Sequence, residues 1–318
     1  MTAFRLPRVS RIDLLLALMV LVWAANYSLV KQAFREIAPM PFNVARFSLA
    51  SAAFLIGIAW VRHRARRSQA VNSAFYTAHP PTAADWRQFI WLGLVGHCAY
   101  HLLWATGLSM TTASNSALLV GAGPVVVSTT AAWLGHERIR RAHWYGIVVS
   151  LAGVVLVVGR GASIAGPTIW GDLLTLSAIG CWTFLTIGGS RLMTRHSPLY
   201  VSGVVTTIGT LAYIVLALPS LGSVGWMSLG PRVWGVIVFS GLLSVAAASV
   251  IWYAAVRQIG VARTSAYSNL VPLVAVLIAA YVIPEPLTPT KIIGAALVLA
   301  GVVLTRLART APAAPIEE

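Results

Sequence analysis

The chain has 318 residues and a net charge of +15, and 58% of its residues are hydrophobic while only 10% are charged. Soluble domains carry about 25% charged residues, so this composition excludes an ordinary soluble enzyme or binding module. Too little polar chain remains between the apolar stretches to form a separate soluble domain.

The apolar stretches predict ten membrane-spanning helices, because each approaches the roughly 20 residues that a helix needs to cross a bilayer. They lie at 13–33, 41–61, 86–107, 112–134, 143–159, 170–190, 198–218, 232–256, 262–283 and 289–307. The predicted fold class is therefore an all-α membrane protein with ten transmembrane helices.

Basic residues are distributed unevenly between the two sides that these helices define. With the N-terminus inside, the inside segments hold seventeen of the 23 Lys and Arg residues and the outside loops hold five. The positive-inside rule then predicts a multi-pass protein of the inner (plasma) membrane with both termini in the cytoplasm. The Arg-rich start of the inner loop 62–84 suits anionic lipid headgroups better than nucleic acid, so no nucleic-acid partner is expected.

The first two predicted helices hold polar side chains at membrane depth. Asp13 is the predicted N-cap, and Trp23, Asn26 and Tyr27 share one face of the first helix. A lone amide at mid-membrane needs a partner or water, so Asn26 either bonds another helix or lines a polar cavity. For Arg46 three placements stay open: snorkelling outward, binding carbonyl groups, or facing a cavity.

The predicted third helix has a stripe of four ring side chains, His97, Tyr100, His101 and Trp104. Two histidines four residues apart are also the spacing of zinc-binding helices, but no carboxylate lies within this helix. A cavity face or satisfied core histidines are therefore favoured over a metal site, and no metal or cofactor is expected.

Proline interrupts the predicted fourth and ninth helices near their centres. Pro124 follows Gly121 and Gly123, and Pro272 lies 148 residues after Pro124. Proline removes a backbone donor and crowds the preceding turn, and a broken helix inside a bilayer is tolerated only against protein or a water-filled cavity. Paired breaks of this kind point to the binding site of a transporter.

The interval between the two prolines belongs to an internal repeat. The same interval relates Trp104 to Trp252, and the hexapeptide Leu-Ala-Gly-Val-Val-Leu occurs at 151–156 and again at 299–304. Each repeat holds five predicted helices, and because five is odd the second repeat has to be inverted in the membrane. The predicted domains are a first repeat at 1–160 with the cytoplasmic loop 62–84, a second repeat at 161–307, and a disordered cytoplasmic tail at 308–318.

The candidate substrate-binding residues are the aromatic and polar side chains on these faces and beside the breaks. They are Trp23, Asn26, Tyr27, Arg46, His97, Tyr100, His101, Trp104, Asn115, Trp182, Trp252, Tyr267 and Asn269. Aromatic walls suit an apolar or aromatic solute. Because none of the predicted helices has a carboxylate at mid-membrane, Arg46 and the histidines favour a solute with a carboxylate over an organic cation.

Several stretches resemble the EamA family of the drug/metabolite transporter superfamily. They are Trp23-Ala-Ala-Asn-Tyr-Ser, Thr111-Thr-Ala-Ser-Asn-Ser-Ala-Leu, Leu151-Ala-Gly-Val-Val-Leu and Ser265-Ala-Tyr-Ser-Asn-Leu-Val-Pro272. The resemblance extends from Asp13 to Leu307 and implies ten helices in two inverted five-helix repeats, with export of small metabolites such as amino acids. The sequence departs from the family pattern at Gly135-His136-Glu137, where the family commonly has Gly-Glu.

These observations predict a secondary transporter that exports small metabolites, neutral or aromatic amino acids above all, by alternating access around a midplane cavity. Export of other small organic solutes or drugs is the alternative. A membrane-embedded enzyme using His97 and His101 is less well supported, because no carboxylate orients them and no Ser/His/Asp set is visible.

The same two histidines are the candidate proton carriers, and facilitated diffusion is favoured over proton coupling. The expected partners are a small-molecule substrate and the lipid bilayer, and a homodimer is left open.

Overall fold

The computed structural model describes residues 10–67, 75–121, 123, 126, 130, 141–159, 167–268, 270–282 and 288–307. Over these residues the chain is helical and contains no strand, which confirms the predicted all-α class. Several predictions fall wholly or partly outside the described residues, among them Pro124, Asn269, part of the loop 62–84 and the whole tail 308–318.

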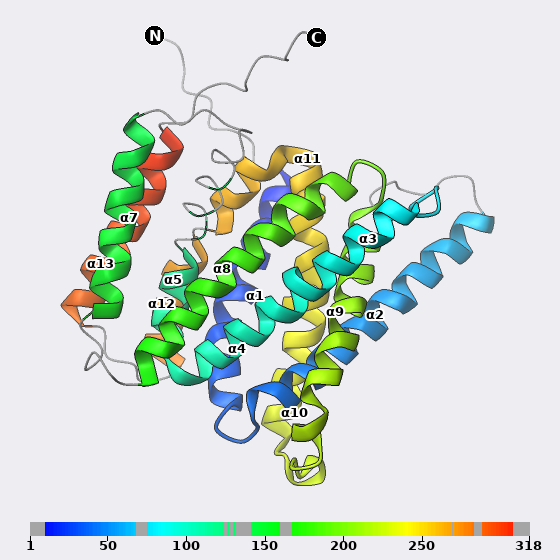
Figure 1. The fold of residues 1–318 in the computed structure, drawn as a ribbon, viewed down its shortest axis with the longest axis horizontal. Coiled ribbons are helices and arrows are strands. Elements are labelled where there is room, and N and C mark those ends of the chain that lie inside the picture. The colour runs from blue at the N-terminus through cyan, green and yellow to red at the C-terminus, as the bar shows by residue number, and fades with distance from the viewer. Residues whose placement is uncertain are drawn as a thin grey trace.

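Figure 1 shows the helices along the chain. In chain order they are α1 (Arg11–Ala33), α2 (Pro39–Arg67), α3 (Ala83–Trp91), η1 (Leu92–Ala99), α4 (Tyr100–Met110), α5 (Ala113–Gly121), α7 (Arg141–Gly159), α8 (Pro167–Leu192), α9 (Pro198–Leu221), η2 (Trp226–Ser228), α10 (Pro231–Val238), η3 (Phe239–Ala247), α11 (Ala248–Ser268), α12 (Leu270–Val282) and α13 (Pro289–Leu307). Segments η1 and η3 are π-helical, and η2 is a 3₁₀ turn.

Six helices among the described residues are long and apolar enough to cross a membrane, so the protein is a multi-pass membrane protein. They are Arg11–Ala33, Pro39–Arg67, Ala83–Met110, Thr168–Leu192, Pro198–Leu221 and Pro231–Ile259. Shorter apolar helices occupy Trp144–Leu156, Leu270–Val282 and Pro289–Gly301. The count of ten and the inverted repeats stay predictions, since the predicted helix 112–134 is described continuously only to Gly121.

The N-cap of the first helix lies three residues earlier than predicted. Ser10, not Asp13, is the N-cap of α1: its hydroxyl accepts from the Asp13 backbone N–H, and the Asp13 carboxylate accepts from the Ser10 backbone N–H. This reciprocal arrangement is a capping box. The same arrangement of Thr82 and Asp85 starts α3.

The ninth predicted helix, 262–283, is helical at each of its described residues, 262–268 and 270–282. These residues belong to α11, which is described to Ser268, and to α12, which is described from Leu270. The break expected at Pro272 stays a prediction, because Asn269 lies outside the described residues.

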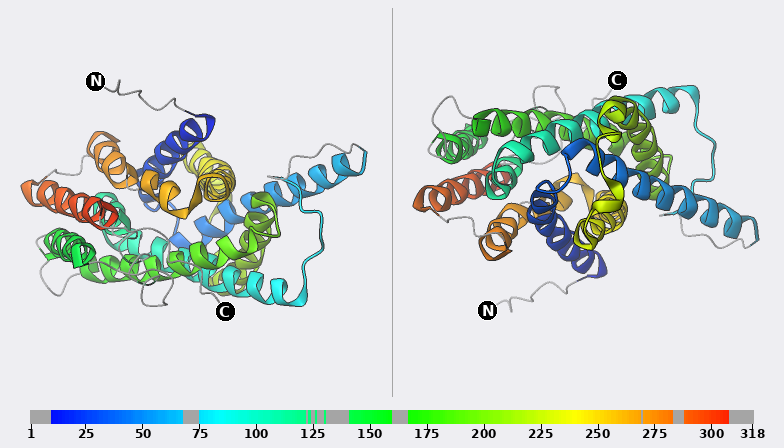
Figure 2. Two further views of the ribbon diagram at one scale, coloured as in Figure 1. Left: turned by 90° about the horizontal axis from the view of Figure 1, so that it is seen from above. Right: turned by 90° about the horizontal axis from the view of Figure 1, so that it is seen from below.

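The helices pair across the two predicted repeats. The main contacts join α1 to α12, α2 to α9, α4 to α8 and α7 to α13, so each pair takes one helix from before residue 160 and one from after residue 166. Figure 2 shows α7 and α13 together at one edge of the molecule and the C-terminal part of α2 at the other. A Cβ on Gly153 would lie 2.6 Å from the Val298 backbone nitrogen, which shows how closely α7 and α13 pack.

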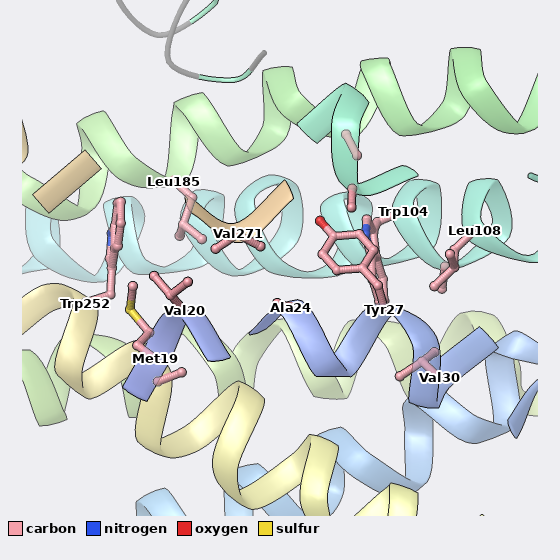
Figure 3. Packing of buried hydrophobic residues seen from close by; sticks show 14 of the residues in the cluster. Met19, Val20, Ala24, Tyr27, Val30, Trp104, Leu108, Leu185, Trp252 and Val271 are labelled. Carbon is pink, nitrogen blue, oxygen red and sulfur yellow. The ribbon is translucent and has the colours of Figure 1, made fainter. Parts of the chain in front are cut away.

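The central core forms around α1. Met19, Val20, Ala24 and Val30 are buried along it, and Figure 3 shows Trp252 near one end of this row and Trp104 near the other. Because α1 contacts both α11 and α12, its polar face at Asn26 and Tyr27 is placed inside the bundle.

Candidate functional site

A cavity of about 150 Å³ lies inside the bundle. Cavities of about this size in other proteins hold a molecule such as benzene. Its wall is contributed by both predicted repeats: α1, α2, η1, α4 and α5 on one side, and α8, α9, η3, α11 and α12 on the other.

Ten of the thirteen candidate residues line this cavity. They are Trp23, Asn26, Tyr27, Arg46, His97, Tyr100, His101, Trp104, Trp182 and Trp252. Three of the predicted break residues, Gly121, Gly123 and Pro272, line it as well. The structure therefore brings together residues that are up to 249 positions apart in the sequence, between Trp23 and Pro272.

Asn115 and Tyr267 do not line the cavity. The Tyr267 hydroxyl donates to Asp13 Oδ1 at 2.7 Å and joins the end of α11 to the start of α1. Asn115 is buried in the first turn of α5, where its backbone N–H donates to Thr112 Oγ1 at 3.1 Å. Both residues thus have structural contacts at helix ends.

Arg46 is the charged residue of the cavity wall, and its side chain is almost fully buried at 1% exposure. It therefore faces the cavity instead of snorkelling outward. Its guanidinium lies 4.6 Å from the centre of the Phe47 ring and 5.3 Å from that of Trp104. Among the described residues no carboxylate lies within 4.0 Å of it, and every ion pair found there involves Asp85.

Neutral side chains hold this cation in place. Arg46 Nε donates to Asn43 Oδ1 at 2.7 Å, and Nη1 donates to Ser240 Oγ at 2.8 Å. The Asn43 amide in turn donates to the Tyr213 hydroxyl at 2.8 Å. We call Asn43, Ser240 and Tyr213 the Arg46 cradle. Its members are all buried, and they come from α2, η3 and α9.

The two histidines lie beside Arg46. Their ring centres are 4.6 Å apart, and His101 Nδ1 is 3.5 Å from Arg46 Nη2. The Phe47 ring packs against both, at 4.7 Å from His97 and 4.5 Å from His101. The sequence left two interpretations of these histidines open, a cavity face or satisfied core residues. The structure supports the cavity face, because both histidines line the cavity.

Three tryptophans from three helices meet at another part of the wall. The ring centres of Trp23, Trp182 and Trp252 are 5.7–5.8 Å apart in every pairing. Trp23 Nε1 donates to the Ser244 carbonyl of η3 at 3.0 Å, which fixes the orientation of that indole. Tyr100 continues the aromatic wall, 5.4 Å from Trp182 and 4.6 Å from His101, toward Arg46.

Asn26 provides an acceptor in the same cavity. Its side chain is 6% exposed, and its Oδ1 has no hydrogen-bond partner among the described residues. A buried carbonyl oxygen without a donor is costly unless a ligand or water supplies one. Lys31, one turn further along α1, donates instead to the carbonyls of Leu108 and Ser109 at the end of α4.

Sequence reasoning missed the Arg46 cradle. Asn43 precedes Arg46 by three residues on one helix, a spacing that could have suggested the contact. Ser240 and Tyr213 are distant in sequence, so no local pattern points to them. The cavity also has hydroxyl groups that were not predicted, on Thr186, Ser202, Thr206, Ser244 and Ser249.

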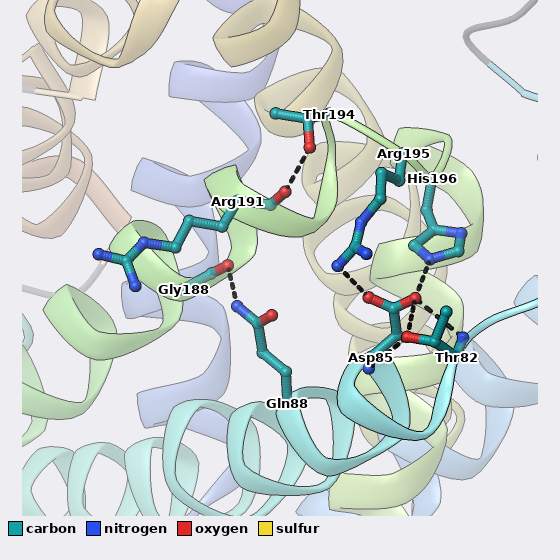
Figure 4. Close-up of polar contacts among 8 residues, drawn as sticks. All are labelled: Thr82, Asp85, Gln88, Gly188, Arg191, Thr194, Arg195 and His196. Atoms are coloured by element: carbon teal, nitrogen blue, oxygen red, sulfur yellow. Dashed lines mark hydrogen bonds and ion pairs between the residues drawn. The ribbon is translucent and has the colours of Figure 1, made fainter. Parts of the chain in front are cut away.

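A second polar cluster lies away from the cavity (Figure 4). One Asp85 carboxylate oxygen forms an ion pair with Arg195, and the other lies 3.3 Å from His196 Nε2. Gln88 donates to the Gly188 carbonyl at 2.9 Å. These contacts fasten the start of α3 to α8 and to the turn that follows it, so this carboxylate is occupied by structural partners.

Comparison with known proteins gives a consistent family. The EamA-like transporter family matches residues 10–159 and again 169–307. An uncharacterized transporter of Archaeoglobus fulgidus is 28% identical, over 93% of this chain and 97% of its own length. A probable terminal-alkyne amino-acid exporter of Streptantibioticus cattleyicolor is 26% identical over 91% of both chains.

A solved structure shares the fold. A crystal structure of a protein with 21% sequence identity superposes with a TM-score of 0.64, covering 94% of this chain and 98% of its own. The two family matches together span most of the sequence, in agreement with the helices and cavity described above. The chain therefore belongs to the EamA-like transporter family.

Proposed function

We propose that this transporter exports small solutes bearing a carboxylate, neutral amino acids in particular, by alternating access around the cavity. The observation on which the proposal depends is Arg46, a buried cation in the cavity wall with no carboxylate within 4.0 Å among the described residues. A charge inside a membrane protein that lacks an internal counter-ion typically marks a substrate pathway. A solute carboxylate would supply that counter-ion.

The rest of the wall fits a zwitterion. Asn26 Oδ1 is an acceptor without a donor and could receive an ammonium N–H. The three clustered tryptophans offer an apolar surface to a side chain. The volume of about 150 Å³ favours a small solute. The printed name of the Streptantibioticus cattleyicolor relative, a probable exporter of an amino acid, supports the same class.

Export of other organic solutes or drugs is the second candidate. Its cationic form would require an anionic side chain in the pathway, because a cation is costly to desolvate alone. The described lining residues include Arg46 but no Asp or Glu. This favours anionic or zwitterionic solutes over quaternary ammonium compounds.

The test is exchange of labelled leucine by the purified protein in liposomes, with leucinamide as the analogue that lacks a carboxylate. Arg46→Gln should raise the half-saturating leucine concentration by about tenfold or more, the factor that corresponds to about 1.4 kcal/mol. Arg232→Gln is the matched control, because Arg232 is exposed and bonds Gln32 outside the cavity. Robust transport of quaternary ammonium dyes without leucine exchange would overturn the proposal.

A further inference from the structure

We propose that Asn43 is a positioning residue that holds Arg46 as an uncompensated cation, so that the solute's carboxylate completes the ion pair. This inference rests on the proposed function and extends it to a residue that does not line the cavity. Asn43 is fully buried between α2 and α9, and its amide contacts both Arg46 and Tyr213.

The orientation of the Asn43 amide follows from its two partners. A guanidinium only donates hydrogen bonds, so the atom that faces Arg46 Nε at 2.7 Å has to be the amide oxygen. The amide nitrogen is then directed at the Tyr213 hydroxyl, 2.8 Å away, which accepts. Tyr213 thus prevents the amide from turning over, and Arg46 is presented in one orientation.

The cradle holds the cation without neutralising it. Asn43 and Ser240 are both uncharged acceptors. Together with the longer contact between Nη2 and His101, the contacts to Asn43 and Ser240 use at most three of the five guanidinium N–H groups. The remaining N–H groups suit a carboxylate, which pairs with guanidinium through two parallel hydrogen bonds.

The choice of asparagine is chemically specific. Aspartate has nearly the same shape but would place a permanent anion 2.7 Å from Arg46 Nε. Such an internal counter-ion would compete with the solute for the same charge. An amide at this position therefore keeps the affinity of Arg46 available for the ligand.

The decisive variant is Asn43→Asp, with two readouts in the full-length protein. In exchange assays the half-saturating leucine concentration of this variant should rise by about tenfold or more. The inhibition of leucine exchange by a given concentration of leucinamide should stay as in the wild type. In thermal unfolding, Asn43→Asp should be at least as stable as the wild type, because the new carboxylate pairs with a buried cation. In an Arg46→Gln background the same change should lower the melting temperature, because the carboxylate is then buried without a cation.

The matched control is Ser51→Ala. Ser51 donates to Thr210 at 3.0 Å between the same two helices, α2 and α9, but touches neither Arg46 nor the cavity. Its loss should leave the half-saturating leucine concentration unchanged. Equal effects of Ser51→Ala and Asn43→Asp on that concentration would reduce Asn43 to a packing role and overturn the inference.

The outcomes separate this inference from the proposed function. If Arg46→Gln weakens leucine exchange but Asn43→Asp does not, the positioning role is wrong and the proposed function stands. If Arg46→Gln leaves leucine exchange unchanged, the proposed function fails, and the ligand assigned here fails with it. The melting temperatures in the two backgrounds then still decide whether position 43 and Arg46 form a pair.

Discussion

His97 and His101 lie next to a cation, which limits what they can do with a proton. His101 Nδ1 lies 3.5 Å from Arg46 Nη2, and a guanidinium does not accept a proton. No Asp or Glu is among the described residues that line the cavity. The described wall therefore offers this pair no carboxylate as a partner in a proton relay, which favours facilitated diffusion.

We predict that a pH gradient drives no net accumulation of leucine. Liposomes containing the protein are given equal leucine on both sides and an imposed pH gradient, and the internal concentration is followed. Leucine has no net charge near neutral pH, so the accompanying potential does not move it. The double variant His97→Gln with His101→Gln should show the same absence of accumulation, whatever its exchange rate. Accumulation that follows the gradient and disappears in the double variant would instead establish the pair as the coupling site.

At the scale of helices, the two predicted breaks meet. A Cβ on Gly121 of α5 would lie 2.8 Å from Pro272 Cγ of α12, so the helices are in contact at that point only because residue 121 is glycine. We predict that Gly121→Ala destabilises the protein by about 1–3 kcal/mol, the usual range for overpacking, and slows leucine exchange.

Gly180→Ala is the control for this change. A Cβ there would meet nothing within 4 Å, so the substitution should be neutral or slightly stabilising. The measurements are thermal unfolding in detergent and the exchange rate in liposomes. Wild-type behaviour of Gly121→Ala in both assays would mean that α5 and α12 do not depend on this contact.

The sequence predicted some of these elements better than others. Helical spacing placed Trp23, Asn26 and Tyr27 on one face because that spacing depends only on local geometry. The π-helical segments η1 and η3 have no proline and were not predicted.

Tertiary contacts explain what local patterns could not show. A Cβ on Gly241 of η3 would lie 2.6 Å from the Arg46 carbonyl oxygen, and one on Gly93 of η1 would lie 2.6 Å from Ile208 Cγ2. The wide turns of η1 and η3 thus coincide with close approaches to other helices, and π-helical turns are frequent at functional sites. Ser240 and Tyr213 of the Arg46 cradle likewise make their contacts with residues distant in sequence, Arg46 and Asn43.

For the whole molecule, the cavity depends on both predicted repeats at once. The pairs α1–α12, α2–α9 and α4–α8 each join a helix of the first predicted repeat to a helix of the second. The hydrogen bond from Arg46 to Ser240 also joins the two repeats. A movement of one repeat against the other would therefore change the cavity wall directly. That is the requirement for alternating access around a shared site.

The orientation in the membrane is a prediction of the basic residues that the fold makes testable. The end of α2, with Arg64, Arg66 and Arg67, lies at the end of the bundle where α1 begins, and η2 lies at the opposite end (Figure 1). The positive-inside rule places the Arg-rich end in the cytoplasm.

We predict that in spheroplasts a membrane-impermeant maleimide labels Met227→Cys, a fully exposed position of η2, but labels Arg66→Cys only after the membrane is permeabilised. The parent protein, with buried Cys98 and partly buried Cys181 replaced by alanine, is the background control. Labelling of Arg66→Cys in intact spheroplasts, with Met227→Cys protected, would show the opposite orientation, with the Arg-rich end outside the cell.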